Sequence, residues 1–141
     1  MYTSIRCGAG KTKISVTANG DIFPCDSFVG IEKYKLSNIE NMKEQLNNLN
    51  NEFFSLSVNN REKCIKCWAK YICGGDCPYN SFLCNNNIYE PDKYFCEIQK
   101  YLIELSIHLV YILAQDDKLM NEICQFARLR EYREVKELKE I

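Results

Sequence analysis

The chain has 141 residues, with 18 basic and 19 acidic side chains and a formal net charge of −1. This length suits one domain with a modest hydrophobic core. Because the sequence has no basic excess or basic stripe, it does not predict a protein that binds nucleic acid.

The hydrophobic segments predict neither export nor a place in a membrane. The first residues, MYTSIRCGAGKTK, lack the apolar stretch of a signal peptide. The most apolar run, Leu102–Leu113, contains Glu104 and His108 and is too short and too polar to span a bilayer. We therefore expect a cytoplasmic protein whose cysteines stay reduced.

The segment KISVTANGDIFPC predicts a β-hairpin near the N-terminus. Ile14 and Val16 alternate with polar neighbours, as they do in a half-buried strand. Asn19 and Gly20 tolerate the positive φ angles of a tight turn, and Asp21–Phe23 provides the returning strand.

Helical patterns follow in two regions. Residues 37–50 have a helix-like pattern, with Ser37 or Asn38 as the N-cap. Pro91 and Asp92 suit the start of a second helical region. Apolar residues then recur at helical spacing, at Ile98, Leu102, Leu105, Leu109 and Ile112. A break at residues 115–117 separates this helix from a charged helix at about 119–138, which faces solvent or docks a partner.

Seven of the nine cysteines form one spaced pattern. The pattern reads Cys7-x12-Gly20-x4-Cys25, then Cys64-x2-Cys67-x5-Cys73-x3-Cys77, then Cys96. Thiolates bind soft metals, and groups of four serve Zn²⁺ or iron–sulfur clusters. The predicted hairpin would fold the chain back so that Cys7 and Cys25 approach the same site. In a reducing compartment this spacing indicates metal binding rather than disulfides.

The spacing resembles the SPASM domain, the C-terminal extension of many radical S-adenosylmethionine (radical SAM) enzymes that modify peptides and proteins. That family has C-x(9–15)-G-x4-C, a gap, C-x2-C-x5-C-x3-C, a second gap and a last cysteine. The flanking segments NGDIFPC, YKLSNI, CGGDC and KYFC also resemble the family. The resemblance extends from Cys7 to Cys96, about two-thirds of the chain.

The motif of the radical SAM core itself, C-x3-C-x2-C, does not occur in this sequence. Cys73-x3-Cys77 is followed by Cys84 after six residues instead of two. The chain is also too short for the partial (β/α) barrel of that core. We therefore expect the auxiliary-cluster part of such an enzyme, as a truncated product, a fragment or a split partner. It should bind no S-adenosylmethionine by itself, and the core would act in cis or in trans.

The resemblance implies two 4Fe-4S clusters with interleaved ligands. The first cysteine set is Cys7, Cys25 and Cys77. The second cysteine set is Cys64, Cys67, Cys73 and Cys96. Cys84 is the candidate fourth ligand of the first cluster, with a free thiol or an open iron site as the alternatives.

Asp26 follows Cys25 directly, in the sequence PCD. In the anaerobic sulfatase-maturing branch of the family, an aspartate at this position is a proposed proton acceptor, so Asp26 is a candidate catalytic residue. The alternative, which we favour, is that Asp26 is a turn-forming aspartate after a strand.

Other side chains suit packing or shielding. We expect Cys124 and the single histidine, His108, to pack on helix faces rather than to bind metal. Trp68 and Tyr71 flank the central cysteines and are expected to shield a cluster from solvent.

These features predict an α+β fold: a small cysteine-rich metal-cluster domain with an N-terminal β-hairpin, irregular cluster-binding loops and C-terminal helices. The cluster domain would span residues 1–100, and residues 101–141 would form a helical extension.

The expected function is that of a SPASM module in a radical SAM maturase, serving electron transfer and the positioning of a ribosomal peptide or protein substrate. A structural zinc-binding interaction module is the alternative. A disulfide scaffold is disfavoured by the odd number of cysteines.

Overall fold

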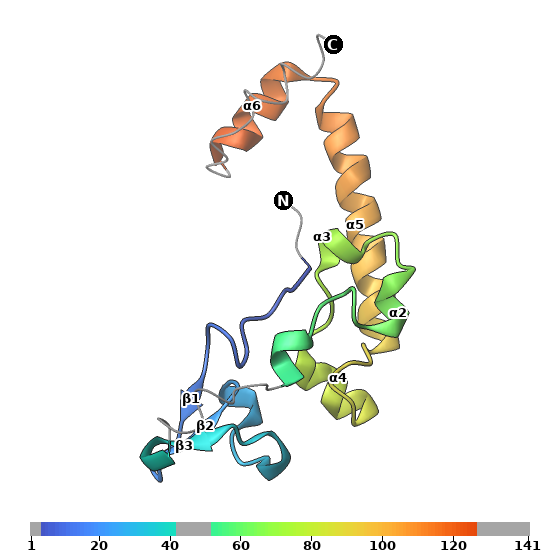
Figure 1. Cartoon of the computed structure of the whole chain (residues 1–141). Helices are drawn as coiled ribbons and strands as arrows, with labels where there is room; N and C mark the ends of the chain where they lie inside the picture. The colour runs from blue at the N-terminus through green and yellow to red at the C-terminus, as the bar shows by residue number, and fades with distance from the viewer. Residues whose placement is uncertain (1–3, 42–51, 127–141) are drawn as a thin grey trace. The chain divides into compact units, whose positions relative to one another are not determined.

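The computed structural model describes residues 4–41 and 52–126. The fold is mixed, with a small antiparallel sheet and several helices, in agreement with the predicted α+β class (Figure 1). Its contacts divide the chain into two compact units, Met1–Lys100 and Tyr101–Ile141.

The sheet has three strands in the order β1-β2-β3, all antiparallel. The strands are β1 at Ser15–Val16, β2 at Asp21–Phe23 and β3 at Ser37–Asn38. Ser15 faces Phe23 in the first pair, so the predicted hairpin is confirmed. At its turn Gly20 has φ 82°, and its N–H donates to the carbonyl of Thr17 at 2.9 Å. Glycine adopts this angle without strain.

The third strand replaces the start of a predicted helix. Ser37 and Asn38 pair with β2, and a 3-10 turn at Ile39–Asn41 follows. The Asn38 side-chain amide donates to the Asn19 carbonyl at 3.0 Å and to the Asp21 carboxylate at 2.9 Å. These bonds tie Asn38 to the hairpin turn, so it does not cap a helix there. Residues 42–50 of the predicted helix lie outside the described residues.

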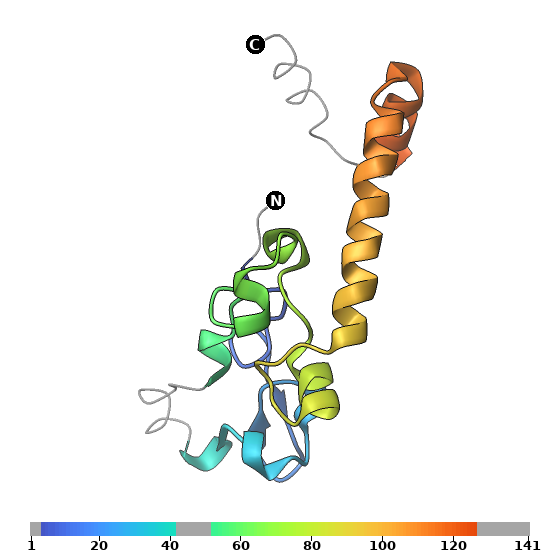
Figure 2. The same ribbon diagram turned by 90° about the vertical axis from the view of Figure 1, so that its right-hand side faces the viewer.

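Three short helices carry or flank the central cysteines: α2 at Glu62–Ile65, α3 at Lys70–Cys73 and α4 at Pro78–Asn85. The prediction of irregular loops is therefore wrong for much of this segment (Figure 2). The amides of Cys64 and Ile65 both donate to the Arg61 carbonyl, at 2.8 and 3.1 Å, which closes the single turn of α2. Gly74, with φ 70°, ends α3 in the left-handed conformation.

Two longer helices follow, and both begin at an aspartate cap. Helix α5 spans Lys93–Leu113, and the Asp92 carboxylate accepts the Phe95 N–H at 2.8 Å. Helix α6 spans Asp117–Phe126, with Asp116 as the corresponding acceptor. The predicted helix starts and the break between them are confirmed, and the predicted continuation beyond residue 126 lies outside the described residues. Within the described ranges, we find no helix with the length and apolarity that a membrane crossing requires.

The core of the first unit is built mainly from aromatic rings: Phe28, Tyr34, Phe53, Tyr79 and Phe82. Phe28 is completely buried, and its ring centroid lies 4.8 Å from that of Tyr34 and 5.3 Å from that of Phe53. Both pairs meet edge to face, which adds to the stabilisation from burial alone. Cys25 belongs to this core and Cys7 packs against it. The aromatic core therefore positions two of the predicted ligands.

We predict that Phe28→Ala destabilises the first unit by about 3–5 kcal/mol, because it leaves a cavity among well-packed rings. Phe54→Ala is the matched control, since 54% of the Phe54 surface is exposed; it should change the stability by less than about 0.5 kcal/mol. Denaturation with urea measures both free energies of unfolding. Equal losses in the two variants would contradict the proposed core.

Candidate metal centre

Three cysteines of the second cysteine set lie on α2 and α3 and the turn between them. Cys64 is a buried residue of α2, and Cys67 follows in a turn, its N–H donating to the Cys64 carbonyl at 2.9 Å. Cys73 is the last residue of α3, and its N–H donates to the Ala69 carbonyl at 2.8 Å. Two single helical turns thus bring together cysteines that are separated by two and by five intervening residues in the sequence.

The fourth member, Cys96, lies in the first turn of α5. Its N–H donates to the Asp92 carbonyl at 3.1 Å. The Asp92 N–H in turn donates to the carboxylate of Asp76 at 3.0 Å. Asp76 lies between Cys73 and Cys77 in the sequence and is 3% exposed. This buried carboxylate therefore fixes the beginning of α5 against the central cysteine segment.

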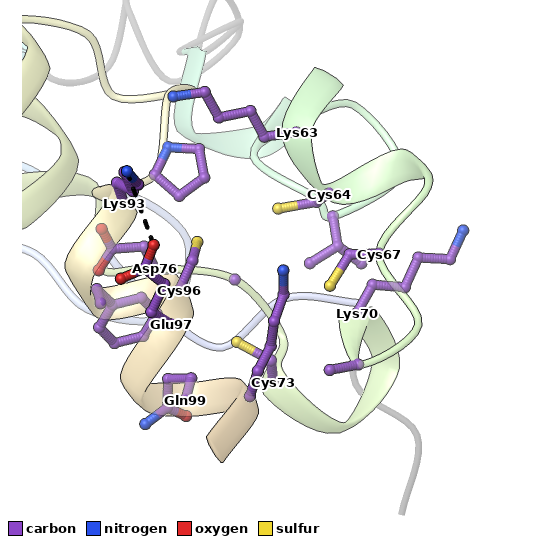
Figure 3. A pocket seen from close by; sticks show the side chains of 16 residues that line it. Lys63, Cys64, Cys67, Lys70, Cys73, Asp76, Lys93, Cys96, Glu97 and Gln99 are labelled. Atoms are coloured by element: carbon purple, nitrogen blue, oxygen red, sulfur yellow. Dashed lines mark ion pairs between the residues drawn. The ribbon is translucent and has the colours of Figure 1, made fainter. Parts of the chain in front are cut away.

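All four cysteines of the second cysteine set line one cavity of about 330 Å³. Figure 3 shows their sulfur atoms around a common open space, with Cys96 on the left, Cys64 and Cys67 on the right and Cys73 below. The structure thus brings together cysteines from three helical segments that span more than thirty positions of sequence.

Four lysines also line this cavity: Lys63, Lys70, Lys93 and Lys100. Lys63 forms an ion pair with Glu90 at 2.6 Å, and Lys93 pairs with Glu97 at 3.9 Å. Lysine side chains around a group of thiols favour an occupant that makes the centre negatively charged, as a thiolate-bound metal cluster does.

Burial of the cavity thiols disfavours their ionised form. Burial raises the pKa of Cys96 to about 11, and nearby Cys64 adds to the effect. Burial also raises the pKa of Cys64, while Arg61 acts in the opposite direction. Both groups are therefore neutral thiols at pH 7 when no metal is bound, and a metal must displace their protons in order to bind.

Among residues 4–41 and 52–126, no three Cys, His, Asp or Glu side chains are grouped closely enough to hold one metal ion. The four thiols surround a space and do not converge on a point. A tetrahedral zinc site requires all four sulfurs at bonding distance from one centre. In a four-iron cluster each cysteine binds a different iron, so its ligands stand further apart.

The first cysteine set is less completely assembled. Cys25 is buried in the aromatic core, Cys7 is half-buried against it, and the Lys13 ammonium is within electrostatic reach of both thiols. Cys77 precedes α4 and is exposed. The four-cysteine cavity includes none of these three side chains.

Cys84 and Cys124 lie apart from the described cavities. Cys84 is an exposed residue of α4, with its sulfur 4.0 Å from the side-chain oxygen of Asn80. Its role as a fourth ligand stays a prediction. Cys124 is a half-buried residue of α6, in the second unit.

Asp26 begins a 3-10 turn directly after the hairpin, as expected for a turn-forming residue. Its carboxylate lies 2.6 Å from the Lys13 ammonium and is largely exposed. The hydrogen bond from Lys13 lowers the pKa of Asp26, so the carboxylate is ionised at neutral pH. An ionised carboxylate that is held by an ammonium is a weaker base, so a proton-accepting role would require Lys13 to move away.

Trp68 and Tyr71 are 54% and 38% exposed and do not line the four-cysteine cavity, and their shielding role stays a prediction. The expectation for the histidine is wrong. His108 is an exposed residue of α5 and does not pack in a core.

Sequence reasoning missed two buried charged residues next to the cavity, Arg61 and Asp76. The signals were the arginine three positions before Cys64 and the aspartate within CGGDC. Gly75 lies close to the side chain of Arg61. A Cβ atom on Gly75 would lie 3.1 Å from Nη1 of Arg61 and 3.3 Å from Cγ1 of Val58.

Comparisons with known proteins leave the family open. No family model matches the chain. An uncharacterized protein of Archaeoglobus fulgidus is 26% identical over 116 residues, which cover 79% of this chain and 26% of that protein. The chain therefore spans about a quarter of the length of the relative that it matches.

We predict that Gly75→Ala destabilises the protein more than Gly30→Ala does. Both glycines have positive φ angles, of 92° and 86°, so both variants carry backbone strain of about 1–2 kcal/mol. Only the Cβ atom at position 75 meets other atoms, while nothing lies within 4 Å of the one at position 30. The free energy of unfolding from urea titrations measures the difference, and equal values would show that the fit against Arg61 is not important.

Proposed function

We propose that the first unit holds two 4Fe-4S clusters and serves as the auxiliary module of a radical SAM maturase, which modifies a ribosomal peptide or protein. When bound, the clusters would supply one-electron transfer. The protein residues would hold them in place, set their electrostatic surroundings and position the substrate.

The observation that carries this proposal is the arrangement of the second cysteine set. The resemblance to the SPASM domain assigns Cys64, Cys67, Cys73 and Cys96 to one cluster. These are also the four cysteines around the 330 Å³ cavity. The resemblance and the folded chain thus select the same residues, although Cys96 is separated from the others by 23 or more positions.

The chemistry of the cavity supports a thiolate-bound cluster. Four thiols are spread around one volume. The donors are all sulfur, which is the usual ligand of iron–sulfur clusters. Lys70 and Lys100, which also line the cavity, would balance part of the negative charge of a thiolate-bound cluster.

The first cluster would use the first cysteine set, which comprises Cys7, Cys25 and Cys77. The fourth iron would bind Cys84 or remain open to another ligand. Support here comes from the resemblance and from the location of Cys7 and Cys25 at the aromatic core. Asp26, beside Cys25, remains the candidate proton acceptor.

The reaction on S-adenosylmethionine would belong to a core that carries C-x3-C-x2-C, either in the same polypeptide or in a separate partner. The archaeal relative is consistent with a module of a larger protein, because the matched segment covers only 26% of its length.

We predict that the protein, purified without oxygen, contains about eight irons and eight acid-labile sulfides per chain. Chemical analysis for iron, sulfide and zinc on one sample measures this directly. One or two zinc ions without sulfide would contradict the proposal and favour the structural zinc module.

Cysteine variants then assign the ligands. Cys73→Ser and Cys7→Ser should each remove about half of the iron, because each replaces a thiolate in a different set. Cys124→Ser is the matched control and should keep all of the iron, since it changes a cysteine of the second unit. An equal loss from all three variants would indicate general instability and not ligation.

A further inference from the structure

Arg61 is almost completely buried, with 3% of its surface exposed. Its Nη1 donates to the carbonyl of Asp76 at 2.9 Å, and its Nη2 donates to the carbonyl of Ile88 at 3.1 Å. In the described part of the chain, no carboxylate lies within ion-pair distance of this guanidinium. The full positive charge is therefore buried with two neutral carbonyl groups as its hydrogen-bond partners.

A buried charge without an opposite charge costs several kcal/mol. A guanidinium does not escape this cost by losing its proton, because its pKa is too high. Burial lowers the pKa of Arg61, while Cys64, Asp76, Cys77 and Cys73 act in the opposite direction. One carboxylate and three of the predicted cluster ligands thus lie within electrostatic reach of this charge.

Arg61 lies beside both cysteine sets. Cys64 and Cys73, which belong to the second set, are within electrostatic reach of its guanidinium. So is Cys77, from the first set, and Arg61 also lines a small cavity together with Cys7. Each of the two sets therefore has members next to the same buried cation.

The surrounding backbone is built to admit this side chain. A Cβ atom on Gly75 would lie only 3.1 Å from Nη1 of Arg61, so the glycine leaves room for the guanidinium. The two carbonyls that hold the guanidinium come from separate segments. Arg61 is thus fixed at the junction of the two sets and is not a mobile surface cation.

We propose that Arg61 is a positioning residue shared by the two clusters, and that its buried positive charge raises the reduction potential of both. This inference rests on the proposed function. Each one-electron reduction adds one negative charge to a cluster, and a nearby buried cation stabilises the reduced form over the oxidised form.

The test measures cluster midpoint potentials in titrations with a chemical reductant, followed by electron paramagnetic resonance. In Arg61→Gln, we expect the ratio of oxidised to reduced cluster at a fixed potential to rise about tenfold, which is a shift of about 59 mV to lower potential for a one-electron couple. Arg61→Lys keeps the charge, so it should shift the ratio much less.

Asp76→Asn provides a test of opposite sign. It removes a buried negative charge beside the same sites and leaves an oxygen that can accept hydrogen bonds, so the potentials should rise. Lys118→Gln is the control for Arg61→Gln: it makes the same change in net charge at an exposed residue of the second unit and should leave the potentials unchanged. If Arg61 had only a structural role, the potentials would not fall in Arg61→Gln while they rise in Asp76→Asn.

The outcomes separate the two proposals. Wild-type protein without iron and sulfide overturns the proposed function. Wild-type protein with both clusters, together with an Arg61→Gln variant of full iron content and unchanged potentials, overturns the role of Arg61. If the Arg61 variants do not fold, Asp76→Asn decides: unchanged or lowered potentials overturn the inference.

Discussion

The buried carboxylate of Asp76 holds together the segments that carry the cysteines. It accepts hydrogen bonds from the Asp92 N–H at the start of α5 and from the side chains of Asn80 and Ser81 on α4. Its own backbone carbonyl accepts a bond from Arg61, which precedes α2. One residue of CGGDC therefore links the segments at α2, α4 and α5. Through the Asp92 amide it links the start of α5, and hence Cys96, to the central cysteine segment.

The aromatic core fixes the hairpin side of the same unit in a different way. Phe28 follows the hairpin, Phe53 precedes the central cysteines and Phe82 lies on α4, so their contacts join regions that are distant in sequence. Cys25 is part of this core. The two cysteine sets thus depend on different forces: apolar packing at the hairpin, and buried hydrogen bonds with charges at the cavity. Arg61 and Gly75 lie where the two regions meet.

Local signals in the sequence predicted much of this arrangement. The alternation around Asn19-Gly20 predicted the hairpin, and Pro91-Asp92 predicted where α5 begins, because turn and cap residues act through their immediate neighbours. The resemblance to the SPASM domain implied the set of four thiols that line the cavity. Strand β3 was missed because Asn38 has the side chain of a good N-cap, and only its bonds to the hairpin turn reveal its place in the sheet. The roles of Arg61 and Asp76 depend on tertiary burial, which periodicity in the sequence does not report.

If the cavity holds a cluster as proposed, binding of metal and folding should depend on each other. Three of its four thiols come from the short helices α2 and α3 and the turn between them, and the fourth comes from the first turn of α5. In the proposed state, thiolate–metal bonds would cross-link these segments and so stabilise the fold. Burial raises the pKa of Cys96 to about 11, so a metal would compete with a proton for this sulfur. Metal binding should therefore strengthen as the pH rises toward that value. Lys100 at Cys96 and Arg61 at Cys64 act against the effect of burial, because each cation favours the ionised, ligand form of the sulfur.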